Sequence, residues 1–96
     1  LASVAKPEEV KKVIETALEG DFLTARTKLL EVMLNYGLSG LDIIKQIQKE
    51  IWSLSIDGRK KVELIEKVGE IEFRMVEGSD EYVQLEALLA YFVSRK

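Results

Sequence analysis

The stretch of residues 79–95 has an apolar pattern that constrains the fold more than any other part of the chain. It opens with a serine and two acidic residues, which suit the start of a helix, and its apolar run covers residues 82–93. At about 100° per residue, the two polar interruptions, Gln84 and Glu86, fall on nearly opposite sides of a helix, so no continuous polar face remains. Such a helix must be covered by other helices, by another subunit or by both.

The remainder of the chain shows helical periodicity broken by short turn signals. Pro7, Asp21 and Ser39 suit helix starts, and single glycines follow most of the expected helix ends. We therefore expect an all-α fold, a compact five-helix bundle with short loops. The expected helices span residues 7–19, 22–36, 41–54, 59–77 and 79–95. Residues 1–6 show no periodicity, and we interpret them as a linker that precedes a helical domain spanning residues 7–96.

The expected helix at 59–77 carries two apolar stripes, about 130° apart on a helical wheel. One stripe holds Leu64, Val68, Ile71 and Met75, and the other holds Val62, Ile65, Gly69, Phe73 and Val76. Two stripes imply two neighbours. Together with the apolar helix at 79–95, they provide more apolar surface than a small bundle can cover by itself.

Part of this apolar surface is therefore expected to face other subunits. The candidate interface residues lie on the last two helices: Leu64, Ile71, Met75, Tyr82, Tyr91 and Phe92. For each of them the alternative is an ordinary core position, because cores and interfaces share the same composition.

Arg26 falls near the middle of the apolar arc of the expected helix at 22–36. Its stem can pack against that arc while the guanidinium reaches solvent. The alternative is a buried or interfacial ion pair, which needs a carboxylate because an unpaired buried charge is very unfavourable. Glu72 lies between the two stripes of its helix, and Glu86 interrupts the last apolar run. We therefore expect Arg26 to pair with Glu72 or with Glu86.

The composition excludes several kinds of active site. The chain has 96 residues, a net charge of −3, no Cys and no His, so thiolate and imidazole chemistry are absent. No GxxxxGK[ST] or GxGxxG loop is present to hold a phosphate. The acidic charge argues against a dedicated nucleic-acid binder, and no apolar run approaches the roughly 20 residues that span a bilayer. We expect a cytoplasmic domain without catalytic, cofactor-binding or metal-binding residues.

Two groups of charged residues remain as alternatives. Glu63, Glu66 and Glu70 share one side of a helix, but Lys67 lies beside them and the row is typical of a solvated face. The basic run at 59–61 lacks interleaved aromatic residues and sits at a helix start, which is unfavourable for cations. An enzyme that uses Glu or Lys would need a pocket with converging carboxylates.

Three ordered segments resemble the C-terminal domain of the archaeal replication factor C small subunits, which belong to the sliding-clamp loaders. The segments are GDFLTARTKL, YGLSGLDIIKQIQKEIW and KVGEIEFRMVEGSDEYVQLEALLAYF. The resemblance covers nearly the whole chain, from about Pro7 to Phe92. Any one match alone is weak, whereas the ordered series is specific. Residues 1–6 would correspond to the hinge that leaves the upstream ATPase lid.

The resemblance implies a five-helix domain whose role is assembly. In such loaders, subunits join through these domains into a closed collar, and the attached ATPase modules grip the sliding clamp and primer–template DNA. The implied partners are other clamp-loader subunits, in a homo- or hetero-oligomer. ATP and Mg²⁺ would bind in the upstream modules, because the family's catalytic motifs have no matching position here. By itself, the chain is expected neither to bind nor to hydrolyse ATP.

A free-standing helical adaptor is the alternative function. Such a protein docks a partner helix in a groove between its own helices. A stable monomer with an open groove and no ring-forming contacts would favour this alternative.

Overall fold

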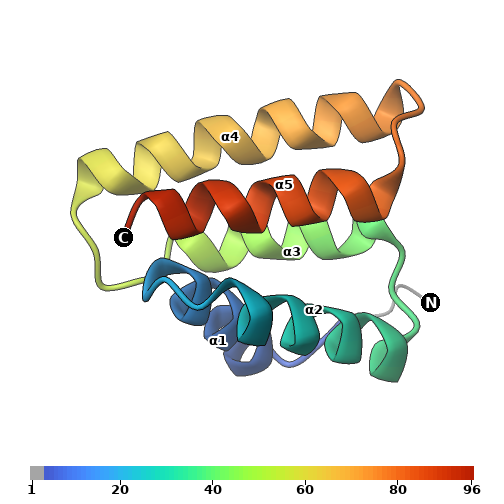
Figure 1. Ribbon diagram of the computed structural model, residues 1–96, viewed down its shortest axis with the longest axis horizontal. Coiled ribbons are helices and arrows are strands. Elements are labelled where there is room, and N and C mark those ends of the chain that lie inside the picture. The colour runs from blue at the N-terminus through green and yellow to red at the C-terminus, as the bar shows by residue number, and fades with distance from the viewer. Residues whose placement is uncertain (1–3) are drawn as a thin grey trace.

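The computed structural model describes residues 4–96 as five α-helices joined by short loops (Figure 1). The helices are α1 (Pro7–Leu18), α2 (Phe22–Tyr36), α3 (Gly40–Ile51), α4 (Gly58–Val76) and α5 (Glu81–Ser94). No strand occurs within residues 4–96, so the predicted all-α five-helix bundle is confirmed. Within the same range, no helix has both the length and the apolar character needed to cross a bilayer.

The helix starts depend on side chains that the sequence places there. Asp21 and Asp80 each accept a hydrogen bond from the backbone N–H three residues later, at 3.1 and 2.9 Å. At the start of α3, Ser39 and Asp42 form a capping box in which each side chain binds the other residue's backbone N–H. The Ser39 N–H bond holds the pKa of Asp42 below its ordinary value. Gly37 ends α2 with a φ of 65°, a conformation that favours glycine.

The third helix is shorter than predicted. The sequence suggested an end at Leu54, whereas α3 ends at Ile51. The N–H groups of Ser53 and Leu54 donate to carbonyls three residues back, which tightens the chain into a turn. Leu54 still reaches the core, where it is 3% exposed. The apolar periodicity therefore continues past the end of the helix because the turn returns this side chain to the interior.

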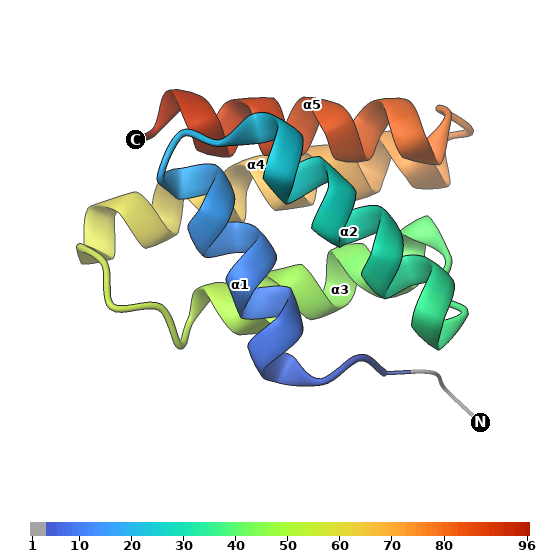
Figure 2. The same ribbon diagram turned by 60° about the horizontal axis from the view of Figure 1, so that its bottom comes forward.

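The helices are arranged around a central pair. In Figure 1, α5 lies in front of α3, α4 lies on one side of this pair, and α1 and α2 lie on the other. Figure 2 shows α1 and α2 crossing in front of α3. α5 packs against each of the other four helices. This order places α2 and α4 on opposite sides of the domain.

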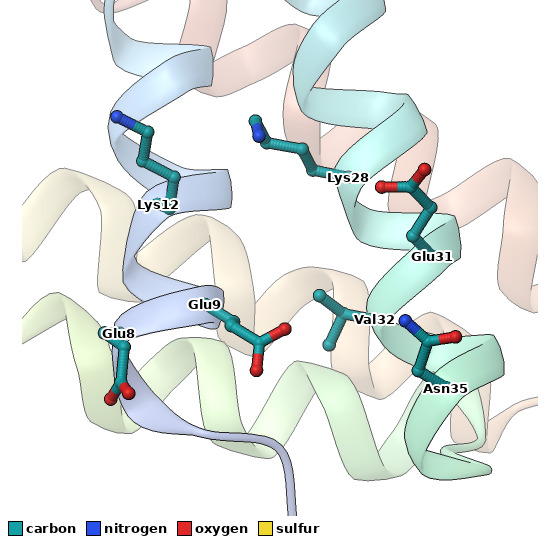
Figure 3. Close-up of a pocket in the computed structure, with 7 residues that line it drawn as sticks. All are labelled: Glu8, Glu9, Lys12, Lys28, Glu31, Val32 and Asn35. Atoms are coloured by element: carbon teal, nitrogen blue, oxygen red, sulfur yellow. The ribbon is translucent and has the colours of Figure 1, made fainter.

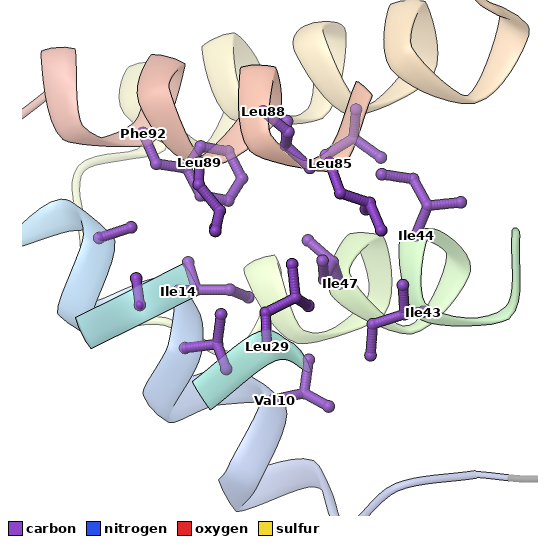
Figure 4. Close-up of a cluster of buried hydrophobic side chains, with 14 of the residues drawn as sticks. Val10, Ile14, Leu29, Ile43, Ile44, Ile47, Leu85, Leu88, Leu89 and Phe92 are labelled. Carbon is purple, nitrogen blue, oxygen red and sulfur yellow. The ribbon is translucent and has the colours of Figure 1, made fainter. Parts of the chain in front are cut away.

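The core consists mainly of branched aliphatic side chains that meet between the helices (Figure 4). The residues labelled in Figure 4 are all 2% exposed or less: Val10, Ile14, Leu29, Ile43, Ile44, Ile47, Leu85, Leu88, Leu89 and Phe92. Full burial of one such side chain stabilises a fold by about 1.5–3 kcal/mol. The four core residues of α5 therefore make its inner face a major source of stability.

The other helices cover only one side of α5. Its outer face carries Val83, Ala87 and Ala90, all of which are exposed. The sequence left open whether the cover for this helix comes from the same chain, from another subunit or from both. In the structure, helices of the same chain cover the inner face of α5, whereas the outer face stays exposed in residues 4–96.

Arg26 of α2 pairs with Glu86 of α5, with 2.5 Å between Nε and Oε2. The sequence suggested either Glu72 or Glu86 as the partner of Arg26, and the structure pairs it with Glu86. Glu72 lies instead on the side of α4 that faces α3. Both side chains of the pair are almost half exposed, at 43% and 44%. The guanidinium therefore stays in contact with water, as the snorkelling alternative expected. The pair ties α2 to α5 across the surface rather than through the core.

A buried amide holds the segment before α1 against α3. The Gln46 side chain accepts a bond from the Ala5 N–H at 3.1 Å and donates to the Ala5 carbonyl at 2.6 Å. Gln46 is 8% exposed and Ala5 only 1%. The side-chain amide thus satisfies both backbone groups of a buried residue, as a neighbouring strand would. The predicted linker at residues 1–6 stays a prediction, since residues 1–3 lie outside the described part of the chain.

We expect Gln46→Met to destabilise the domain by about 2 kcal/mol, because two buried backbone groups of Ala5 would lose their partners. Urea denaturation measures the loss, and hydrogen exchange at the Ala5 amide should accelerate with it. Gln48→Met, on the half-exposed side of the same helix, is the control. Unchanged stability together with unchanged exchange at Ala5 would contradict this role for Gln46.

We expect the Arg26–Glu86 pair to contribute little to stability, because both side chains are almost half exposed. A double-mutant cycle with Arg26→Met and Glu86→Gln should give a coupling free energy of about 0.2–1 kcal/mol. The coupling should shrink further in high salt, which screens exposed charges. A coupling well above this range that resists salt would mean that the pair is effectively desolvated.

Candidate subunit interface

The outer side of α4 carries an apolar stripe that residues 4–96 leave largely open, with only Ile65 partly buried against the core. We call this the α4 stripe, and its members recur at helical spacing: Val62, Ile65, Gly69, Phe73 and Val76. Phe73 is 63% exposed, and Val62 and Val76 are almost as open. Beside the stripe, Ile65 and Gly69 line a groove of about 260 Å³ with residues of α3. The stripe therefore lies on the edge of α4 that borders α3.

Gly69 has no structural reason to be a glycine within this chain. A glycine in a helix interior destabilises the helix by about 1 kcal/mol relative to alanine. A Cβ added at Gly69 would find no atom within 4 Å. Within residues 4–96, the space next to Gly69 is therefore open.

A second apolar surface lies along α2 and α5. We call it the α2–α5 surface, and its members are Leu23, Leu30, Leu34, Tyr82, Val83 and Ala87. Leu34 is 82% exposed and Leu23 is 75% exposed, values unusual for leucines in a stable fold. Leu30, Leu34 and Tyr82 line a hollow of about 260 Å³ where the two helices come together. The surface therefore lies on the edge of α2 that borders α5.

The two apolar surfaces face away from each other. α3 and α5 form the middle of the domain, with α4 and α2 on opposite sides of them (Figure 1). The α4 stripe borders α3, whereas the α2–α5 surface borders α5. A single copy of the domain cannot cover either surface with the other.

Most of the interface residues suggested by the sequence belong to the core instead. Leu64, Ile71, Met75 and Phe92 are between 0% and 6% exposed. They are core positions, because the inner stripe of α4 packs on α3 and α5 and Phe92 lies on the buried face of α5. Tyr82 is exposed and belongs to the α2–α5 surface.

Tyr91, the sixth suggested residue, is half-buried and already has neighbours within the chain. The Lys67 Nζ lies 4.9 Å from the centre of its ring, and the Arg95 guanidinium lies 5.0 Å from it. Both cations are within the range of a cation–π contact. Tyr91 therefore stabilises the junction between α4 and α5.

The sequence could have identified part of the α2–α5 surface. Leu23 and Leu34 lie about three helical turns apart on one side of the helix, with Thr27 between them, and both fall outside the main apolar arc. Apolar residues left outside such an arc are a signal for a second contact. What the sequence did not indicate is that this stripe adjoins Tyr82, since that proximity depends on how α2 packs on α5.

Two carboxylates of the row on α4, Glu63 and Glu70, form surface ion pairs. Glu70 pairs with Lys67 at 3.2 Å and with Arg74 at 2.5 Å, and Glu63 lies 3.7 Å from Arg95. These pairs confirm the solvated face that the sequence suggested. Between residues 4 and 96, no group of three or more His, Cys, Asp or Glu side chains is placed to hold a metal ion.

A polar hollow of about 310 Å³ lies between α1 and α2. Figure 3 shows its lining residues: Glu8, Glu9, Lys12, Lys28, Glu31, Val32 and Asn35. Glu9 accepts a bond from the Tyr36 hydroxyl, which raises the pKa of Tyr36 above its ordinary value. The remaining charged residues are two lysines and two glutamates, so the open rim carries both signs. Such a mixture resembles a solvated surface rather than a site selective for one ligand.

The basic run at 59–61 also has a structural role. The Lys61 ammonium donates to the Trp52 carbonyl at 2.9 Å, at the end of α3, where a cation is favourable. This bond joins the end of α3 to the first turn of α4. One of the three cations of the run is therefore engaged within the domain.

Residues 5–91 match the family described as "Replication factor C C-terminal domain". The replication factor C small subunit of Thermococcus kodakarensis is 52% identical over 92 residues, which are 96% of this chain and 11% of that protein. The small subunit of Methanocaldococcus jannaschii is 54% identical over 90 residues, which are 94% of this chain and 5% of that protein.

The small subunit of Archaeoglobus fulgidus is 47% identical over 91 residues, which are 95% of this chain and 28% of that protein. The chain thus spans between a twentieth and about a quarter of the length of these relatives. The family match covers the segment from Ala5 through most of α5, so it includes both apolar surfaces almost completely. On this match and these identities, the chain belongs to the replication factor C C-terminal domain family.

Proposed function

We propose that this chain is the subunit-assembly domain of a DNA sliding-clamp loader. In this role it would form part of a helical collar that holds ATPase subunits together while a clamp is loaded during DNA replication. The observation that carries the proposal is the exposed α4 stripe, an apolar helix face for which the domain itself has no cover. Family membership and the archaeal small-subunit relatives support it.

The proposal assigns no chemistry to the domain. The sequence has no histidine, no cysteine and no GxxxxGK[ST] or GxGxxG phosphate-binding loop, and the proposal gives this domain no role in nucleotide binding or hydrolysis. ATP and Mg²⁺ would bind in other modules of the parent protein. Contacts with the sliding clamp and with primer–template DNA would likewise be made by the complete loader, and the partners of this domain would be other loader subunits.

A free-standing adaptor remains the second candidate, because the groove between α3 and α4 is open and partly apolar. An adaptor would use that groove for one partner helix and would itself stay monomeric. It would leave the α2–α5 surface without a role, although this surface carries the most exposed leucines of the described chain. Sedimentation of the full-length protein over a range of concentrations separates the two functions, since only the assembly domain self-associates.

We expect Phe73→Glu to weaken subunit assembly by at least about tenfold, because burial of a Phe side chain is worth about 1.5–3 kcal/mol. Phe73 is 63% exposed in the single domain, so the helical fold should be retained. Analytical ultracentrifugation of the full-length protein measures assembly, and circular dichroism measures helix content.

Asn35→Glu is the matched control for Phe73→Glu. It introduces the same charge change at another exposed position near the end of a helix, in the polar hollow between α1 and α2. This variant should assemble like the unmodified protein. If Phe73→Glu and Asn35→Glu both assembled normally, the α4 stripe would not be an assembly surface.

A further inference from the structure

We propose that the corner between α3 and α4 binds single-stranded nucleic acid, with the Trp52 ring stacked on a base and the surrounding cations facing phosphates. This inference goes beyond the proposed assembly function and does not depend on it. We call the site the α3–α4 corner, and it comprises one exposed aromatic residue and five basic residues: Lys45, Lys49, Trp52, Arg59, Lys60 and Lys61.

The indole of Trp52 is largely left in water by the domain. Trp52 lies at the end of α3 and is 55% exposed, although tryptophan is on average a highly buried residue. The packing of the core therefore does not account for this side chain. A large flat ring at the surface is suited to stacking, and every nucleobase offers it a flat face of its own.

The outward face of α3 leads to Trp52 through two lysines. Lys45, Lys49 and Trp52 are all exposed and follow one another at spacings of four and three residues, so they share one face of the helix. Glu50 lies about 100° from Lys49 around the helix axis and leaves this face cationic. Glu72 of α4 lines the same groove as Lys45, so the cationic face ends there.

The length of this face fits a short stretch of nucleic acid. Lys45 and Trp52 are seven residues apart, which corresponds to roughly 10 Å along α3 at 1.5 Å per residue. About three stacked nucleotides at 3.4 Å each cover the same distance. One base on the ring and two or three phosphates beside the lysines therefore fit the corner.

The fold brings a second group of cations to the tryptophan. The Lys61 ammonium donates to the Trp52 carbonyl at 2.9 Å, which places the first turn of α4 beside the end of α3. Arg59 and Lys60 lie in the same turn, and within residues 4–96 neither forms a salt bridge. In the sequence, the basic run at 59–61 lacks interleaved aromatic residues. The structure supplies the missing aromatic residue from another helix.

The stability of α4 does not explain the cations in its first turn. The positive end of the helix dipole is unfavourable for Arg59 and Lys60, and only Lys61 has a compensating bond, to the Trp52 carbonyl. A phosphate bound at the corner would reverse this effect, because it would be attracted by the dipole and by the side chains together.

The charge of the domain is unevenly distributed. Residues 43–62 carry five basic and two acidic side chains, although the whole chain has a net charge of −3. Glu15 and Glu19 of α1 line a hollow with Lys60 and limit the cationic surface on that side. The acidic total charge therefore conceals a local surface that attracts phosphates at short range.

The exposed ring favours a single strand over a duplex. Bases in a duplex are already stacked on one another, whereas unpaired bases are free to stack on an aromatic side chain. Binding through stacking and phosphate contacts depends little on base sequence and strongly on salt. Both properties can be measured separately at this corner.

The test measures binding of fluorescently labelled oligo(dT) to the full-length protein by anisotropy at several salt concentrations. Trp52→Leu should weaken binding by at least about fivefold without changing the salt dependence, because it removes stacking but no charge. The double variant Lys49→Gln/Lys60→Gln should reduce the slope of log K against log salt by roughly 1.4, since each phosphate contact to a single strand contributes about 0.7.

Two matched variants serve as controls. Trp52→Tyr keeps an aromatic ring and should bind within about threefold of the unmodified protein. Lys12→Gln/Lys28→Gln removes two charges from the polar hollow between α1 and α2 and should leave binding unchanged. Circular dichroism and sedimentation should show unchanged helix content and assembly for every variant, because no core residue is altered.

Photocross-linking locates the contact within the full-length protein. An oligonucleotide that contains 5-bromodeoxyuridine should form an adduct with the tryptic peptide of residues 50–59, EIWSLSIDGR, which contains Trp52. The same anisotropy measurement with oligo(U) distinguishes DNA from RNA as the preferred strand, and tighter binding of either one supports the inference.

Three outcomes would overturn the site. The first is unchanged binding by Trp52→Leu together with no adduct on residues 50–59. The second is equal cross-linking by a duplex of the same length, which would show that the ring does not stack on unpaired bases. The third is equally effective displacement of the oligonucleotide by polyglutamate, which would make the corner a surface for acidic protein segments. Each of these outcomes leaves the assembly function untouched, since sedimentation tests that function separately.

Discussion

The burial of one face of α5 is the interaction on which the rest of the structure depends. α5 packs against each of the other four helices, and its inner residues, including Leu88 and Phe92, are fully buried. Once that face is turned inward, the positions of the other helices follow, because each must supply the apolar side chains that cover it. The same arrangement also leaves the outer residues of α5 and the outer sides of α2 and α4 exposed in the part of the chain that the structure describes.

Much of the fold could be predicted because it depends on local signals. Helix starts at Asp21 and Ser39, and the helix end at Gly37, are set by capping groups within a few residues of each other. The two stripes of α4 were visible as well, since helical spacing is a property of the sequence alone. Helical spacing alone, however, does not determine which of the two stripes of α4 faces the core. The inner stripe holds larger and more uniformly aliphatic side chains, whereas the outer one is interrupted by Gly69 and carries the aromatic Phe73.

For the same reason, four of the six interface candidates are core residues. Sequence composition does not separate a residue that packs within its own chain from one that packs on a neighbour, so Leu64 and Ile71 looked as suitable as Tyr82. The Arg26–Glu86 contact was within reach of sequence reasoning, because a charge in an apolar arc requires a partner and few carboxylates lay in comparable positions. The contact between Gln46 and Ala5 was not, since it joins residues 41 positions apart through a polar side chain with no distinctive pattern around it.

The attachment of Ala5 to Gln46 has a mechanical consequence. Gln46 projects from α3, and the neighbouring turn of the same helix supplies Lys45 and Gln48 to the wall of the groove beside α4. A pull on the polypeptide ahead of α1 is therefore delivered to the third helix directly, instead of being absorbed by a loose tether. Strain that arises outside the bundle would in this way act on one wall of the groove beside the α4 stripe, which makes the bundle a rigid coupling rather than a passive anchor.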